Sequence, residues 1–194
     1  MPQDASPDNV ISLDAIRAAR RQPALSLVED YWESLREDRL VPRRDDVEPA
    51  ALAGGLSRAF LIERVAPGLA RVRVAGSHLT ELLGMEVRGM PISALFEPHC
   101  RTRLAEALET VFARTAVVRI GLGCRGGIGR PALIGGMVLL PLLDRGEVRC
   151  ALGALSMDGR IGRPPRRPEI RSMARRHLIG AGPAQGDGGA GLPA

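Results

Sequence analysis

The residues of this sequence that are able to bind a metal or attack a substrate are few and scattered. The 194-residue chain has three His and three Cys, and His99 and Cys100 stand side by side. No second ligand follows at a spacing typical of a metal site. Cys100, Cys124 and Cys150 are odd in number and more than 20 residues apart, which fits neither a disulfide framework nor a zinc motif. We expect no metal, and we interpret His99 and His78 as surface or capping residues.

One glycine motif resembles a phosphate-binding loop. The stretch GLGCRG at 121–126 matches the pattern GxGxxG. A dinucleotide-binding loop of this kind must follow a strand and open a helix, but here the chain continues through Pro131 into another apolar stretch. We interpret it as a hairpin turn. No Ser-His-Asp or Cys-His grouping stands out, and neither does a carboxylate pair, so we predict no catalytic residues and no enzyme.

The composition indicates one domain with a basic C-terminal tail. The chain is 45% hydrophobic, and all 27 basic residues are Arg. Up to Ser156, 20 Arg stand against 19 acids, whereas from Met157 onward seven Arg stand against three. Because the positive charge is concentrated in the tail, a nucleic-acid-binding domain is disfavoured. There is no signal-peptide-like apolar region and no run of about 18 apolar residues, so we expect a cytoplasmic protein without a membrane span.

The only Tyr and the only Trp are adjacent, at positions 31 and 32, in a highly charged segment. Leu25, Val28, Trp32 and Leu35 fall on one face of a helix expected over 24–37. This stripe predicts that Trp32 is a packing anchor, buried against the domain or against the same helix of a second subunit. A homodimer through this helix is the expected oligomer.

The remaining pattern predicts an α+β fold. Alternating apolar residues indicate a hairpin of two strands, then two helices, then three more strands. The expected strands cover 58–66, 69–76, 116–124, 131–143 and 147–156, and the expected helices cover 78–83 and 97–114. Together they form a five-stranded antiparallel sheet with helices on one face, preceded by the amphipathic helix.

The expected domain boundaries follow from composition. Residues 1–23 are predicted to be a flexible N-terminal segment, with at most a marginal helix over 12–21. Residues 24–156 form the domain and its leading helix. Residues 157–194 are predicted to be a basic, largely disordered tail with a short basic helix over 168–180.

Several separated motifs resemble a bacterial, mostly alphaproteobacterial, subfamily of PAS domains. The chain reads YWESLREDRLVPRRDD where that subfamily has a Y-W-x-S-L-R helix, a P-x-R and an acidic pair. It then reads RVRVAGSHLTELLG, GMPISALF and LLPLLDRGEVRCALGAL, each similar to the subfamily and in its order. One departure is Gly135-Gly136, which either leaves room for a ligand or weakens the sheet.

The resemblance implies a PAS fold and a sensory or regulatory module that signals in trans. Some PAS domains hold haem through a helical His or flavin through a Cys, but Cys100 lies outside the flavin motif, and we expect no cofactor. The cleft between sheet and helices is expected to be lined by aliphatic residues: Leu82, Leu83, Met90, Ile92, Leu95, Phe96, Leu104, Leu108, Ile120, Leu122, Met137 and Leu139.

Three functions remain open at this point. Such a cleft suits a small hydrophobic ligand held by shape, with a signalling protein as a further partner. Alternatively, the same side chains fill the core, and the protein is a ligand-free interaction or dimerisation module. The third possibility is a nucleic-acid-associated regulator that acts through the Arg-rich tail.

Overall fold

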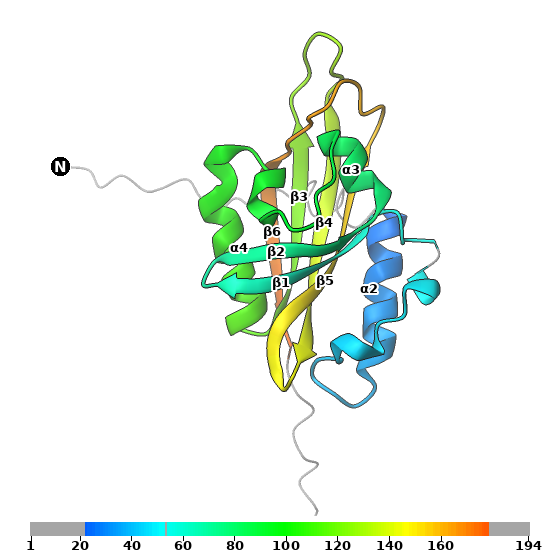
Figure 1. Ribbon diagram of the computed structural model, residues 1–194, viewed down its shortest axis with the longest axis vertical. Coiled ribbons are helices and arrows are strands. Elements are labelled where there is room, and N and C mark those ends of the chain that lie inside the picture. Colours follow the sequence, from blue (N-terminus) through cyan, green and yellow to red (C-terminus); the bar gives the residue numbers. More distant parts are fainter. Residues whose placement is uncertain (1–21, 53, 179–194) are drawn as a thin grey trace, which may run out of the picture.

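The computed structural model describes residues 22–52 and 54–178, and it places them in a six-stranded sheet with helices on both faces (Figure 1). The helix expected over 12–21 lies outside the described residues. The helices are α2 (Pro23–Arg36), α3 (Ser77–Leu83) and α4 (Arg101–Ala113), with short 3-10 turns η1 (Arg44–Asp46), η2 (Pro49–Leu52), η3 (Ile92–Leu95) and η4 (Pro98–Cys100). The strands are β1 (Ala59–Ala66), β2 (Leu69–Ala75), β3 (Ala116–Cys124), β4 (Leu133–Asp144), β5 (Glu147–Asp158) and β6 (Glu169–His177).

The sheet has the strand order β2-β1-β5-β4-β3-β6, and every neighbouring pair is antiparallel. The five strands expected from alternation are confirmed as β1 to β5. Helices α3 and α4 are inserted after β2, as expected, so the α+β fold class is also confirmed. The β1–β2 hairpin is turned steeply against the other strands in Figure 1, and the twist between neighbouring strands of a sheet contributes to this angle.

The sixth strand corrects the sequence prediction. Residues 169–177 are an edge strand, not a basic helix in a disordered tail, and they pair with β3 from Ala116↔His177 to Gly123↔Glu169. The Ile170 side chain is buried in the core, and its backbone N–H donates to Cys100 Sγ at 3.3 Å. The Arg-rich composition hid the strand, because an edge strand keeps one side in water and carries charge readily.

The two faces of the sheet carry separate clusters. Helices α3 and α4 cover the larger cluster, whereas α2 packs on the opposite face (Figure 1). The sequence prediction placed helices on one face of the sheet and expected the leading helix to be buried against the domain or against a second subunit. The structure places this helix against the other face of its own sheet, and β4 and β5 contribute side chains to both clusters. We call them the helix-side cluster and the α2-side cluster.

Two glycine positions show how closely the layers approach. A Cβ at Gly136 would lie 3.1 Å from Leu25 Cδ1, so the glycine makes room for the start of α2. A Cβ at Gly135 would lie 2.1 Å from the Ser156 carbonyl oxygen on the neighbouring strand. At both glycines, the position that a side chain would take is therefore occupied by neighbouring protein atoms.

Candidate functional site

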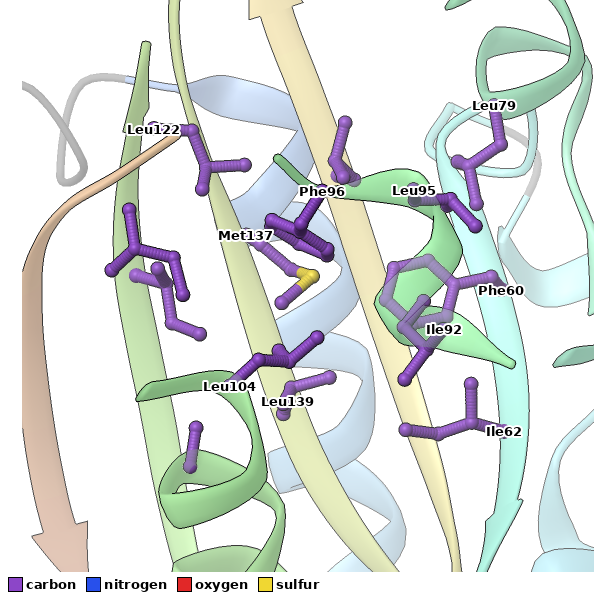
Figure 2. Close-up of a cluster of buried hydrophobic side chains, with 14 of the residues drawn as sticks. Phe60, Ile62, Leu79, Ile92, Leu95, Phe96, Leu104, Leu122, Met137 and Leu139 are labelled. Carbon is purple, nitrogen blue, oxygen red and sulfur yellow. The ribbon is translucent and has the colours of Figure 1, made fainter. Parts of the chain in front are cut away.

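The side chains predicted to line a cleft meet in the structure. Eleven of the twelve are buried members of the helix-side cluster, and the remaining one, Met90, packs partly buried against it. Figure 2 shows Met137 and Leu139 on the sheet and Ile92, Leu95, Phe96 and Leu104 on the segments that cover it. The sequence thus identified the inner surface correctly, and the structure shows that its members form a contiguous core.

Sequence reasoning left out part of this cluster. Phe60 and Ile62 from β1 and Leu79 from α3 are also buried in it (Figure 2). The alternation within residues 58–66 was a sufficient signal for the two strand residues. The Phe60 ring covers Gly153 on β5, where an added Cβ would lie 2.3 Å from the ring, so this cross-strand pair fills the cluster with an aromatic and a glycine. Side chains from the sheet and the helices together form this cluster.

The polar edge of the cluster is His78. The structure corrects its assignment as a surface residue, because it is buried, whereas His99 is exposed as expected. The Met157 N–H donates to His78 Nε2 at 3.1 Å, so the neutral imidazole carries its proton on Nδ1. Burial lowers the pKa of His78 below 6.5, and the nearby Arg58 acts in the same direction.

Metal-binding and nucleophilic groups do not assemble into a site in the described part of the chain. No three His, Cys, Asp or Glu side chains there are grouped to hold a metal. Cys100, Cys124 and Cys150 are buried free thiols. Burial raises the pKa of Cys124, and it raises the pKa of Cys150 to about 11. Thiols in this state are weak nucleophiles at neutral pH.

The glycine motif GLGCRG also takes the predicted form. Residues 121–124 end β3, and the chain then turns through Gly127 and Arg130, which exchange two backbone hydrogen bonds of 2.7 and 3.0 Å. No helix follows, since β4 begins at Leu133. The motif is therefore a hairpin connection, as expected, and presents no helix N-terminus to a phosphate.

Helix α2 is fastened to the other face by its aromatic pair. Trp32 is 0% exposed, and its indole N–H donates to the Pro141 carbonyl at 2.8 Å. The pairing of β3 with β4 ends at Val118↔Leu139, so Pro141 has no partner on β3. Proline lacks the backbone N–H that such a partner would accept, and it is therefore tolerated at this position. Burial of Leu25, Val28 and Trp32 against the sheet confirms the packing-anchor interpretation, while Leu35 is half-buried.

The segment after α2 lies beside β4, on the part of that strand that no longer pairs with β3. The Leu143 N–H donates to the Pro42 carbonyl at 2.9 Å, and Arg43 bridges the same strand. Tyr31 holds the next turn, because its hydroxyl accepts the Glu48 N–H at 2.8 Å. The Tyr31-Trp32 motif of α2 thus contacts the LLPL motif of β4. Together the two motifs hold α2 and the loop that follows it to the sheet.

A charged network holds α2 to β3 and β6, which are neighbours in the sheet. Glu29, nearly buried on α2, forms ion pairs with Arg119 of β3 and Arg176 of β6. Burial raises the pKa of Glu33, but hydrogen bonds from Arg176 and Arg36 outweigh it and leave the pKa below its usual value. The network joins α2 to β6, so the strand missed in the sequence also supports the helix.

The connection between β5 and β6 closes one end of the helix-side cluster. Arg166 is buried without a carboxylate partner among the described residues, and its guanidinium donates to the carbonyls of Ile161 and Pro131. Its backbone N–H donates to the Leu82 carbonyl at 2.6 Å, at the end of α3. The connection therefore bridges α3 and the β3–β4 turn.

The arrangement defines a class of α+β domain in which helices inserted after the second strand cover one face of an antiparallel sheet. A family model described as PAS domain matches residues 20–156, and the chain belongs to this family. PAS domains generally serve as sensory or regulatory signalling modules. No curated protein matches the chain. The family match ends before β6, so the sixth strand is an addition to the matched region.

No helix within residues 22–52 and 54–178 combines the length and the apolar character that crossing a bilayer requires.

Proposed function

We propose that this protein is a non-catalytic PAS regulatory module that signals in trans through contacts with protein partners. The observation that carries the proposal is the packed helix-side cluster, in which the predicted ligand-lining residues pack against one another. Because these buried side chains pack against one another, we propose that the module responds through its surfaces. The leading helix with the Y-W-x-S-L-R sequence supports placing it in the bacterial, mostly alphaproteobacterial, branch, and a cytoplasmic setting is part of the same proposal.

A homodimer is the first partner that we propose. The apolar stripe of α2 is already packed on its own sheet, so the dimer contact falls on the outer side of the helix. Leu27 is 51% exposed there, and its Cδ1 lies 3.3 Å from the position a Cβ would take at Gly54 in the following loop. Exposed apolar groups of this kind are typical of interaction surfaces when they gather in patches.

Sedimentation velocity at tens of micromolar tests this proposal. We expect a dimer for the wild-type protein and a monomer for Leu27→Glu, with Val65→Glu as the matched control because Val65 is equally exposed on β1. A wild-type protein that sediments as a monomer, or a Leu27→Glu variant that remains dimeric, would contradict the contact. The absorption spectrum adds a second check, since a stoichiometric visible chromophore would contradict the packed interior.

The basic C-terminal segment offers weaker support for nucleic-acid binding. Arg171 and Arg176 of β6 are held in ion pairs with Glu169 and with Glu29 and Glu33. Their charge is partly neutralised within the domain, so we regard nucleic acid as an unlikely partner.

A further inference from the structure

An apolar groove lies on the α2 side of the sheet, and residues of both packed clusters form part of its wall. It has a volume of about 780 Å³, within the range of small-molecule sites. Its walls come from the loop after α2 and from the outer face of β1, β2 and β5. The lining residues are Arg44, Val47, Pro49, Leu52, Leu56, Ser57, Ala59, Phe60, Leu61, Val74, Ala75, Gly76, Ser77 and Leu152.

The groove exists because α2 and its following loop cover only part of the sheet. Helix α2 packs on β4 and β5, and the loop reaches the β1 side through Leu52. Beyond it, Val74 of β2 remains 58% exposed and Leu56 of the loop 44% exposed. These are large apolar side chains in water on the two sides of one groove, so covering them is favourable.

The charge at the groove has one sign. Arg44 is the only charged side chain among the described residues that line it, and it takes part in none of the ion pairs found among them. The hydrogen bond from Arg73 and, to a smaller extent, the charge of Arg44 lower the pKa of Glu63, whose direct ion-pair partner is Arg73 at 2.5 Å. Asp144 lies in the same neighbourhood, together with Arg149. The mouth therefore presents a guanidinium whose donors are available to an anion.

We propose that this groove binds an amphipathic anion, a linear acyl chain whose carboxylate pairs with Arg44. The chain replaces water over Leu56, Leu61 and Val74, and the carboxylate accepts hydrogen bonds from the planar guanidinium, which matches its geometry. A groove lined by apolar groups with one cationic end selects such a ligand over a neutral chain and over a small anion without a chain. The site lies on the opposite side of the sheet from the helix-side cluster, and it does not depend on the proposed dimer.

Binding of decanoate to the full chain tests the site, with 1-decanol as the neutral probe. The single Trp reports on it, because Leu52, Ala59 and Leu152 belong both to the groove wall and to the cluster that holds Trp32. We expect a saturable 1:1 change in Trp32 fluorescence, confirmed by calorimetry, with a Kd on the order of 10–100 µM, as a ligand of this size permits. Decanol is expected to bind about tenfold more weakly.

Two substitutions separate the head group from the chain. Arg44→Gln is expected to reduce decanoate affinity about tenfold and to leave decanol affinity unchanged. Val74→Glu is expected to abolish binding of both probes. The matched controls are Arg88→Gln and Val65→Glu, which change exposed residues outside the groove and are expected to bind like the wild type.

Three results would overturn the proposal. The first is the absence of saturable decanoate binding at about ten times the expected Kd. The second is unchanged decanoate binding by Val74→Glu, which would place the ligand elsewhere. The third is a shift of the wild-type protein from dimer to monomer on adding decanoate, with the same shift in Val74→Glu without ligand, since a second copy of the chain would then be the occupant.

Discussion

Replacing Trp32 is expected to destabilise the whole domain, because this one side chain fastens α2 to the sheet. The indole is fully buried among aliphatic residues and donates its N–H to the Pro141 carbonyl at 2.8 Å. Trp32→Ala removes the ring and leaves a cavity, which costs about 3–5 kcal/mol. For a chain of this length, that loss corresponds to a fall in melting temperature of about 6–20 °C.

A second substitution separates the stability contributed by the apolar contacts of the ring from that contributed by the indole hydrogen bond. Trp32→Phe keeps most of the apolar contact but leaves the buried Pro141 carbonyl without its donor, which costs about 1–3 kcal/mol. Tyr31→Phe is the matched control on the same helix, since it removes only the hydroxyl that accepts the Glu48 N–H at a partly exposed site.

The assay is urea denaturation followed by far-ultraviolet circular dichroism, which remains usable after the only Trp is removed. We expect the free energy of unfolding to fall in the order wild type, Tyr31→Phe, Trp32→Phe, Trp32→Ala. A Trp32→Ala protein with an unchanged midpoint and an unchanged oligomeric state would refute the reasoning, because the anchor would then carry no stability.

Three further predictions concern β6, His78 and the buried pair of β1 and β5. A chain ended after Asp158 loses β6, Arg166 and Arg176 and is expected to lose its cooperative unfolding transition; a normal transition would instead restore the domain boundary at Ser156. Because the pKa of His78 is lowered in the folded state, its stabilisation is complete above about pH 6.5 and is lost as the pH falls through the folded pKa. Denaturation between pH 7.5 and pH 5 should therefore show a smaller decline for His78→Gln than for the wild type, and equal declines would count against a neutral His78. Gly153→Val should lower the melting temperature by about 4 °C or more, since its side chain meets the Phe60 ring; an unaffected variant would show that the ring moves freely.

The parts of the fold that follow a regular period could be predicted from the sequence. The alternation of Val118, Ile120 and Leu122 gave β3, and the spacing of Leu25, Val28 and Trp32 gave the buried face of α2. Both patterns are local, so no knowledge of the partner surface is needed to read them. The resemblance to PAS domains then implied a cleft between the sheet and the helices that cover one of its faces.

The parts that depend on distant partners could not be predicted. The burial of His78 rests on the Met157 N–H, 79 positions away, and no local pattern encodes that hydrogen bond. The strand β6 carries Arg175 and Arg176 on an open edge of the sheet, and this basic composition predicts a solvated helix. The burial of Ile170 in the core depends on the partner strand, which no local pattern indicates. The outer groove requires the position of the loop after α2, which is irregular and is fixed by contacts such as Leu143 with Pro42.

The two faces of the sheet are joined through shared strands, and this bears on how a regulatory module of this kind transmits a change. Leu139 of β4 enters the helix-side cluster, while its neighbour Leu140 enters the α2-side cluster. Trp32 is bonded to Pro141 on the same strand, and Gly136 lets α2 contact it directly. Any displacement of β4 therefore acts on α2 without an intermediate element. Helix α2 packs on β4 and β5, and the ion pairs of Glu29 reach β3 and β6, so α2 is held to four strands at once. We expect a partner that releases α2 to compete for those strands or for the arginines that they carry.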